Sequence, residues 1–517
     1  MDSIPRYLIY ILLIFFIFFP IIYLFASVLF PNFQLTSLYS LSDYITFSFN
    51  SRIIEILFRT ILMAAFTSVI AGSIGLALAI LLEYTNLSHR KLFNFLLFIP
   101  FLIPSYIFTF SWMGFLGKRG TFTDIVFQNI PLDIYNPFAV VLFLSLSYFP
   151  IVMFIISLGL KNVDSNLISS ARMSNRKGLI RKILLPLIRP HLLIACFFVF
   201  VLTISEYTVP AFLRVNVYSS EVFAQLAAFY DLRRAIVLSL PLVALALLLC
   251  GSIQFYFRNK SFTTISSFSR KKEAFIFLSK HQKVFAYSFI LLLLLFSLLI
   301  PIGILGVESE MNFFGAIGSA KNQIFNSIST SLLGALAVTF LGFFTSYFLK
   351  KSRSLISLIS FPLAVSSPVI GISLINFYNG LPIPIYGTAW MIILSYLVKF
   401  LPFSILIFSS FFPQVSPSIE ESARMSRSSF SKRIYRIVLP LVKGGFLSSF
   451  AIVFILCIGE VGVTQMVVPP GFQTISMRIE TLMHYANYSY VASLSLFMML
   501  IIFFVYLIYS WAYRKGE

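Results

Sequence analysis

Apolar residues fill long runs along this chain, and polar residues are concentrated in the stretches between the runs. Twelve runs are about as long as an α-helix must be to cross a hydrocarbon core, which takes about 20 residues. The pattern therefore predicts an all-α polytopic membrane protein with about 12 transmembrane helices. The runs lie near residues 7–30, 58–82, 92–116, 137–160, 190–213, 235–257, 284–307, 326–349, 354–378, 388–411, 444–467 and 490–511.

The composition excludes a soluble globular domain. Hydrophobic residues make up 59% of the 517 and charged residues only 11%, whereas soluble domains contain about 25% charged residues. The first run follows Arg6 and is too long for the apolar region of a signal peptide, and no small-residue cleavage site follows it. We therefore expect it to be a retained first span.

The basic residues predict the orientation. Of the 38 Lys and Arg residues, 28 fall in the alternate loops that share a side with the N-terminus. Because Lys and Arg accumulate in cytoplasmic loops, both termini are expected in the cytoplasm. The net charge of +20 is then a topology signal, which argues against nucleic acid as a partner and favours contact with anionic membrane lipid.

The two halves of the chain repeat each other. Ser170-Ala-Arg-Met-Ser174 recurs as Ser422-Ala-Arg-Met-Ser426, 252 residues later, and Pro150 matches Pro402 at the same offset. After these motifs the offset becomes 254, so that Glu206 matches Glu460 and the first copy is two residues shorter. Each half contains six spans, an even number, so both enter the membrane in the same direction as parallel repeats.

These matches divide the chain into three parts. We expect a first repeat over 1–257 with its core at about 58–257, a basic cytoplasmic linker over 258–283, and a second repeat over 284–517 with its core at about 325–511.

A long basic loop separates the fourth and fifth spans of each repeat. In the second repeat two acids, Glu420 and Glu421, open the loop, which suits a helix N-terminus, and Leu439-Pro440 closes it. We expect a short helix, a turn and a second helix, and an exposed helix of this kind can seat in a groove of a soluble partner. The candidate docking residues are Ser170, Ala171, Arg172, Gly178 and Pro186 in the first copy, and Glu420, Glu421, Ser422, Ala423, Arg424 and Pro440 in the second.

These loops resemble the Glu-Ala-Ala loop of ABC importer permeases, which docks on the ATPase subunit. Glu421-Ser422-Ala423 stands at the family's Glu-Ala-Ala, and Arg427 stands where the family usually has Gly. The first copy lacks the Glu, and Asn175 stands at its Gly position. The resemblance therefore implies a type I ABC importer transmembrane fold whose two coupling loops contact the ATPases asymmetrically.

Two further segments are similar to fused ferric-iron permeases: Ile99-Pro-Phe-Leu-Ile-Pro104-Ser-Tyr and Ser205-Glu206-Tyr207-Thr-Val-Pro210. The resemblance implies a permease subunit in a bacterial inner membrane that moves a solute, best guessed as ferric iron. Its implied partners are two copies of an ABC ATPase and a periplasmic or lipid-anchored substrate-binding protein. ATP would bind the partner, and this chain would carry no cofactor. Thiamine, polyamine and phosphonate permeases share much of the layout and remain alternatives.

Carboxylates inside spans point to the translocation route. Glu206 and Glu460 lie in the fifth span of each repeat, where a charge costs about 2.5–3.5 kcal/mol on insertion scales. They would give the route a negative lining suited to a cation, or be hydrogen-bonded to a neighbouring helix, or lie near the outer interface. Tyr207, Pro150 and Pro402 are further candidates for the route, although the prolines also fit simple helix packing.

Lys399 has no equivalent in the first repeat, where Ser147 occupies its position. It is expected to extend to the membrane surface or to pair with an acid.

Enzymatic chemistry finds no support in the sequence. No phosphate-binding G-x-x-x-x-G-K-[ST] loop occurs, the four His are scattered, and the three Cys lie in apolar runs without a metal-binding spacing. We therefore expect neither a catalytic site nor a metal site. A membrane-embedded enzyme is the weaker alternative, and an ion-gradient-driven secondary transporter with six plus six spans is the stronger one, although it has no need of paired docking loops.

Overall fold

The computed structural model describes most of the chain. The residues that it describes are 7, 11, 13–29, 50–117, 120–121, 133–161, 184–257, 276–309, 313–349, 362, 365–382, 384–412, 415–426, 429–485 and 488–516.

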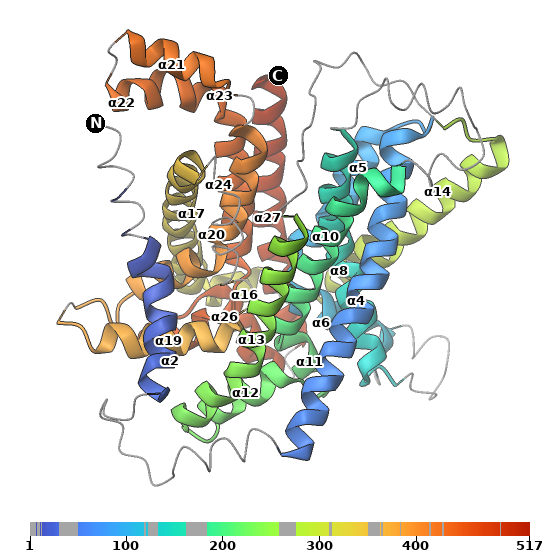
Figure 1. Cartoon of the computed structure of the whole chain (residues 1–517). Coiled ribbons are helices and arrows are strands. Elements are labelled where there is room, and N and C mark those ends of the chain that lie inside the picture. Colours follow the sequence, from blue (N-terminus) through green and yellow to red (C-terminus); the bar gives the residue numbers. More distant parts are fainter. Residues whose placement is uncertain are drawn as a thin grey trace. The chain divides into compact units, whose positions relative to one another are not determined.

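These residues are almost entirely helical, as the sequence predicts, and the only β-structure among them is one isolated bridge between Thr85 and Ile276. Figure 1 shows the helices in sequence colours. They are α2 (Phe19–Leu29), α4 (Ser51–Tyr84), α5 (Arg90–Leu102), α6 (Ser105–Leu116), α8 (Pro137–Lys161), α10 (Leu185–Ser205), α11 (Thr208–Phe212), α12 (Tyr218–Ala227), α13 (Leu232–Phe257), α14 (Lys280–Leu294), α15 (Ile300–Ser309), α16 (Phe313–Ser319), α17 (Lys321–Leu349), α19 (Ser367–Asn379), α20 (Trp390–Phe411), α21 (Pro417–Met425), α22 (Phe430–Arg433), α23 (Leu439–Leu441), α24 (Lys443–Ile458), α25 (Thr464–Val467), α26 (Ile475–His484) and α27 (Tyr488–Gly516), with π-helical turns η1 (Ile14–Phe18), η3 (Leu295–Leu299) and η6 (Ile434–Val438).

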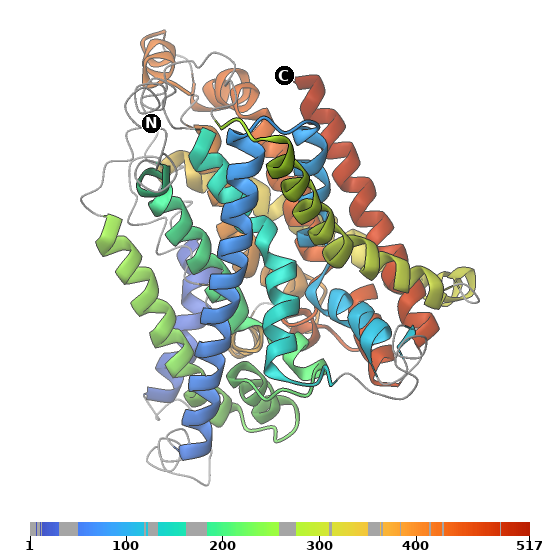
Figure 2. The ribbon, with the colours of Figure 1, turned by 90° about the vertical axis from the view of Figure 1, so that its right-hand side faces the viewer.

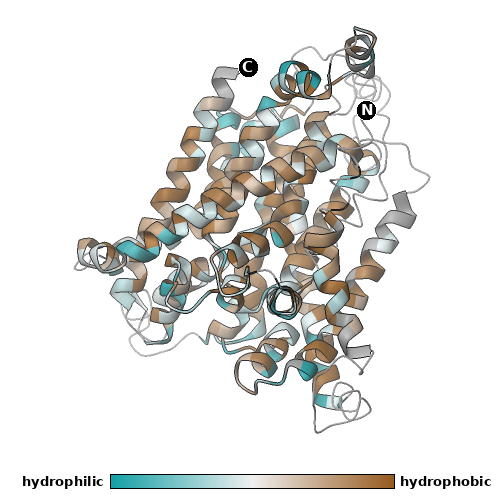
Figure 3. Ribbon diagram, turned by 90° about the vertical axis from the view of Figure 1, so that its left-hand side faces the viewer, coloured by the Kyte–Doolittle hydropathy of each residue, from teal (hydrophilic) through white to brown (hydrophobic). Residues whose placement is uncertain are grey.

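Seven helices within the described ranges are long and apolar enough to cross a membrane, and nine if each of two bent pairs counts as one span. Apolar residues colour the long helices along their length in Figure 3. A polytopic all-α membrane fold is therefore confirmed. The seven are Ser51–Tyr84, Pro137–Leu160, Leu185–Ser205, Lys280–Ser309, Lys321–Phe348, Trp390–Phe411 and Tyr488–Ala512.

Three expected spans are not the straight helices that hydropathy predicts. The run 92–116 is broken into α5 and α6, which meet at 92°, because the residue before a proline disfavours the helical conformation and Ile103, before Pro104, is extended. The expected spans 190–213 and 444–467 end earlier, at Ser205 and Ile458, and each continues into a separate short helix.

The chain forms two compact units that do not follow the two sequence repeats. Unit 1 combines Met1–Ile53, Glu221–Cys250 and Glu308–Glu517, and unit 2 combines Ile54–Ser220 with Gly251–Val307. The first helix of each repeat therefore belongs to the unit that holds the core of the other repeat.

In unit 2, α8 packs on both α5 and α10. A close helix contact forms at Gly75, where an added Cβ would lie 2.6 Å from the Cβ of Val152. The helix over 280–309 joins this unit through Phe296, whose ring stacks on Trp112 with centroids 5.9 Å apart. Figure 2 shows this helix, in yellow-green, running obliquely to the long α4.

In unit 1, α17, α20 and α24 pack closely together. Small polar residues fill their interface, where the Ser449 hydroxyl bonds to Ser404 at 2.7 Å and to Thr339 at 3.3 Å. The N-terminal α2 packs on α19, where Phe19 meets Phe377 edge-on with ring centroids 5.3 Å apart.

The order of the helices repeats within the chain. The first repeat runs α4, α5–α6, α8, α10, α11, α12 and α13, and the second runs α17, α19, α20, α24, α25, α26 and α27. The repeat inferred from a few matching residues therefore extends through the order of the described elements.

Candidate functional site

A break in the helix that forms the fifth span carries the glutamate that the two repeats share. In the first repeat α10 ends at Ser205, and Glu206 has extended backbone before α11 begins. In the second repeat α24 ends at Ile458, and Glu460 follows Gly459 before α25 begins. Each glutamate therefore lies at a helix break, where free backbone N–H groups need acceptors.

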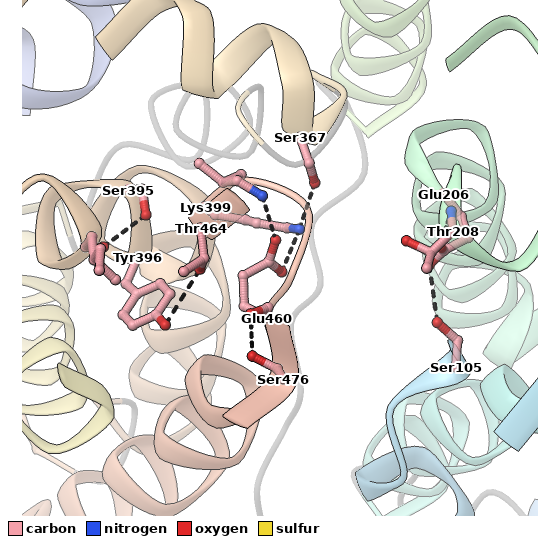
Figure 4. Close-up of polar contacts among 12 residues, drawn as sticks. Ser105, Glu206, Thr208, Ser367, Ser395, Tyr396, Lys399, Glu460, Thr464 and Ser476 are labelled. Atoms are coloured by element: carbon pink, nitrogen blue, oxygen red, sulfur yellow. Dashed lines mark hydrogen bonds and ion pairs between the residues drawn. The ribbon is translucent and has the colours of Figure 1, made fainter. Parts of the chain in front are cut away.

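The Glu206 carboxylate accepts hydrogen bonds from the backbone N–H groups that follow it in the chain. One of its oxygens, Oε1, accepts from the N–H of Thr208 at 2.9 Å and from that of Val209 at 3.4 Å. The other oxygen, Oε2, accepts from Ser105 Oγ at 3.0 Å and from Tyr148 OH at 3.5 Å. The carboxylate therefore joins the first turn of α11 to α6 and α8, and Figure 4 shows its contact with Ser105 of α6.

Glu460 makes the equivalent backbone contact, because its Oε1 accepts from the N–H of Val463 at 2.9 Å. Its Oε2 forms an ion pair with Lys399 Nζ at 2.6 Å, and the same ammonium donates to Ser367 Oγ at 2.7 Å. The carboxylate is buried. Figure 4 shows Lys399 reaching Glu460 and Ser367 together. Lys399 thus pairs with an acid, one of the two arrangements that the sequence allowed.

The backbone of both glutamates is held in the same way. Ser219 Oγ donates to the carbonyl oxygen of Glu206 at 2.9 Å, and Ser476 Oγ donates to that of Glu460 at 3.0 Å. Sequence reasoning missed these serines and also Ser105 and Ser367. Ser105 and Ser367 carried a usable signal, because each follows a proline by five residues, Pro100 and Pro362.

The other route candidates lie in the helical framework. Tyr207 is buried directly after Glu206. Pro150 and Pro402 are buried within α8 and α20, and both helices continue through the proline. Their part in a route stays a prediction.

The second docking loop forms α21, as the pattern of acids and apolar residues predicts. Glu421 and Ser422 are exposed and Ala423 is buried. Glu420 and Arg424 lie in the same helix, and Pro440 is exposed in α23. In the first copy Pro186 is exposed at the start of α10, whereas Ser170, Ala171, Arg172 and Gly178 lie outside the described residues.

An aromatic cluster attaches this loop to the membrane helices. Phe430 stacks on Phe348 of α17 with ring centroids 5.9 Å apart, and it also contacts Tyr347. The guanidinium of Arg433 lies over the same ring at 5.9 Å. The buried members of the cluster are Phe343, Tyr347, Phe408, Phe412, Val415, Ile434, Val438 and Val442.

On its outer side the loop presents isolated apolar side chains. Met425 at the end of α21 is 86% exposed, and Tyr435 is 76% exposed. Figure 1 places α21 and α22 at the end of unit 1 where α27 reaches the C-terminus.

The glutamates do not form a chelating centre. No group of three or more His, Cys, Asp or Glu that could hold a metal ion occurs among the described residues. A single carboxylate with hydroxyl neighbours is suited to brief contact with a passing cation, since conduction requires binding weak enough for release.

A duplicated set of membrane helices with an exposed loop helix is the architecture of a transport permease. The chain belongs to the family described as the binding-protein-dependent transport system inner membrane component, whose model matches it twice, over residues 71–259 and 338–515. The type I importer fold class and the fused, duplicated organisation are thereby confirmed. The protein is therefore a membrane transport component.

The chain is similar to several named transport permeases. The chain is 22% identical over 485 residues to the Fe(3+)-transport system permease protein FbpB 2 of Haemophilus influenzae, covering 90% of this chain and 92% of the relative. It is 22% identical over 477 residues to the ferric transport system permease protein FbpB of Actinobacillus pleuropneumoniae, covering 86% of this chain and 68% of the relative. A protein named for 2-aminoethylphosphonate transport, PhnV of Salmonella typhimurium, is 25% identical over 201 residues, which are 38% of this chain and 76% of PhnV.

Proposed function

We propose that this chain forms both transmembrane halves of an ABC importer, which carries ferric iron from a binding protein outside the membrane into the cytoplasm. A separate ATPase subunit, present in two copies, would dock on the loops near 166–186 and 420–440 from the cytoplasmic side. The observation that carries the proposal is α21, an exposed helix mounted on membrane helices by the Phe430 cluster.

The path of the chain supports mechanical coupling between this loop and the helix break at Glu460. After α21 the chain passes through α22, η6 and α23, bends by 77°, and enters α24. That helix ends at Ile458, two residues before Glu460. A displacement of α21 by an ATPase would therefore act through one stretch of polypeptide on the segment that holds Glu460. Conformational steps of this kind use small shifts of packed helices.

Family membership argues against the ion-gradient alternative, because that family is described by its dependence on a binding protein. Ferric iron as cargo is supported by the names of the FbpB relatives, which align with most of this chain. A phosphonate such as 2-aminoethylphosphonate is the second candidate, supported by the PhnV relative over a shorter segment.

Co-purification with the ATPase subunit tests the docking. We expect Glu421→Lys combined with Arg424→Glu to abolish recovery of the ATPase and to stop ATP-dependent uptake in proteoliposomes. The matched control is Glu55→Lys, since Glu55 is an exposed acid of α4 outside both loops. Full ATPase recovery and uptake by the loop variant would show that the docking assignment is wrong.

The cargo is tested with the binding protein supplied from outside. Proteoliposomes containing the complete transporter are loaded with ATP and offered the binding protein with 55Fe-labelled ferric iron or with labelled 2-aminoethylphosphonate. ATP-dependent accumulation of iron supports the proposal, and accumulation of the phosphonate alone assigns the second candidate.

A further inference from the structure

The two repeats build the same polar site from equivalent positions, and one position differs in charge. Ser105 corresponds to Ser367, and Glu206 corresponds to Glu460. At the remaining position, 252 residues apart, the second repeat has Lys399 where the first has Ser147. Each repeat can therefore be read as a comparison structure for the other.

In the second repeat the site holds a cation that belongs to the protein itself, the side-chain ammonium of Lys399. The ammonium of Lys399 lies 2.6 Å from Glu460 Oε2 and 2.7 Å from Ser367 Oγ. A carboxylate oxygen and a serine hydroxyl thus form two of its contacts, and the Phe400 ring lies at 5.8 Å from it. This geometry shows which groups hold a positive charge at this position of the repeat.

In the first repeat the same two acceptor groups are present without a lysine. Ser105 Oγ lies 3.0 Å from Glu206 Oε2, and Tyr148 OH approaches that oxygen at 3.5 Å. Among the described residues every partner of the Glu206 carboxylate is neutral. Glu206 is also more exposed than Glu460.

Ser147 adds an independent sign that this position lacks a partner. It is only 2% exposed, and its hydroxyl oxygen has no hydrogen-bond partner within the described part of the chain. Buried hydroxyls are usually hydrogen-bonded.

We propose that Glu206, Ser105 and Tyr148 form a binding site for a small external cation, at the position that the Lys399 ammonium occupies in the second repeat. The site takes a positively charged group that one carboxylate and neighbouring hydroxyls can hold, either a primary ammonium or a metal ion that prefers oxygen ligands. The identification of this cation with the cargo rests on the proposed function, whereas the site itself rests on the comparison of the two repeats.

The cation site is asymmetric as a consequence. At the helix break of the second repeat, the Lys399–Glu460 ion pair has no net charge. At the helix break of the first repeat, the Glu206 carboxylate has no basic partner among the described residues, so its negative charge is uncompensated. A transported cation therefore meets a single attractive carboxylate, which favours entry while keeping the binding weak enough for release.

Ligand-dependent stability of the purified full-length chain measures the site without an ATPase. A ligand that binds the folded state alone stabilises that state by RT ln(1 + [L]/Kd), so the unfolding temperature rises with the logarithm of the free ligand concentration once that concentration exceeds Kd. The probes are ethylammonium chloride and, separately, manganese(II) chloride, with tetraethylammonium chloride holding the ionic strength constant because its cation is bulky and has no N–H donor. We expect at least one probe to stabilise the wild type with this dependence on concentration, and the probe that acts distinguishes an ammonium site from a metal site.

Five variants locate the effect. Glu206→Gln should raise the apparent Kd about tenfold or more, as the loss of a charged partner implies, whereas Glu55→Gln on the exposed part of α4 should leave it unchanged. Lys399→Ser should add a second saturable site in the second repeat. Ser147→Lys should remove the response to added cation by supplying a tethered ammonium, and Ser147→Met controls for the bulk of the new side chain.

The proposal is overturned if neither probe stabilises the wild type beyond the tetraethylammonium reference, or if Glu206→Gln binds as the wild type does. The uptake assay separates this result from the proposed function. Cation binding that depends on Glu206, in a chain that transports nothing with its ATPase, would retain the site and remove the cargo assignment.

Discussion

The ring of Phe430 stacks on that of Phe348, with centroids 5.9 Å apart and planes inclined by 15°. Phe348 lies near the end of α17, and Phe430 begins α22 in the loop after α21. The contact therefore joins a membrane helix to the segment proposed to receive force from an ATPase. A flexible connection between the loop and α17 would let the loop move without displacing the membrane helices.

Phe430→Ala should uncouple ATP hydrolysis from uptake. The change removes the stacked pair and its burial, and aromatic pairs contribute about 0.5–1.5 kcal/mol beyond their buried area. We expect uptake per ATP hydrolysed to fall severalfold in proteoliposomes while the chain still inserts and purifies. Phe325→Ala is the control, because Phe325 lies in the same helix α17 as Phe348, outside both loops, and is 72% exposed. Unchanged coupling in Phe430→Ala would mean that the aromatic cluster does not transmit force.

Lys399 and Glu460 should behave as one unit in a double-mutant cycle. Glu460→Gln leaves the Lys399 ammonium without its carboxylate, and breaking a buried pair in this way costs about 3–5 kcal/mol. Lys399→Met leaves the carboxylate uncompensated with a similar cost. We expect the double variant to recover most of the lost thermal stability, measured in detergent, and additive losses would show that the two charges act independently.

Gly75 should tolerate no side chain. A Cβ there would lie 2.6 Å from Val152 Cβ and 2.8 Å from the backbone nitrogen of Met153, so Gly75→Ala must force α4 and α8 apart. Overpacking costs about 1–3 kcal/mol, and the unfolding temperature should fall accordingly. Gly303→Ala is the matched control, since a Cβ at Gly303 meets nothing within 4 Å and alanine favours a helix. Equal stability of the two variants would contradict this packing.

The two halves of the chain should associate when expressed as separate fragments. A split within the linker, between residues 267 and 268, leaves fragments that both contribute segments to unit 1 and to unit 2. Because each unit needs both fragments to bury its apolar faces, we expect co-expressed fragments to co-purify and either fragment alone to be degraded. A split between Gly334 and Ala335 is the control, as it cuts the interior of α17. Stable recovery of a lone fragment would contradict the division into these units.

Patterns within single segments were readable from the sequence. The apolar runs predicted the membrane helices, and Ser422-Ala423-Arg424 after two acids predicted the exposed helix α21. The repeat offset predicted that Glu206 and Glu460 are equivalent, and both lie at a helix break, Glu206 directly after α10 and Glu460 one residue further on, after Gly459. The helix break at Pro104 was not predicted, although the proline is evident in the sequence. Hydropathy counts apolar residues and takes no account of the backbone N–H that proline lacks.

Contacts between segments far apart in the chain could not be predicted from the sequence. Lys399 and Glu460 are 61 residues apart. From the sequence alone Lys399 could extend to the membrane surface or pair with an acid, and nothing in the sequence chose between the two. The serines that hold the carbonyls of the two glutamates come from other segments and look ordinary in sequence. A side chain's partner depends on which helices become neighbours, and hydropathy carries no information about neighbours in a bilayer, where every lipid-facing surface is equally apolar.

By itself, then, the amino-acid sequence determined that the chain lies in a lipid membrane, that it forms membrane-spanning helices, and that its two halves repeat each other. Burial in lipid and the length of a helix are properties of local segments, which a sequence shows directly. Only the tertiary structure decided that the first helix of each repeat joins the compact unit of the other. It also decided that one glutamate is neutralised by a lysine while its counterpart is held by hydroxyl and backbone groups. These outcomes depend on packing between segments far apart in the chain, where small residues such as Gly75 and Gly342 permit close approach.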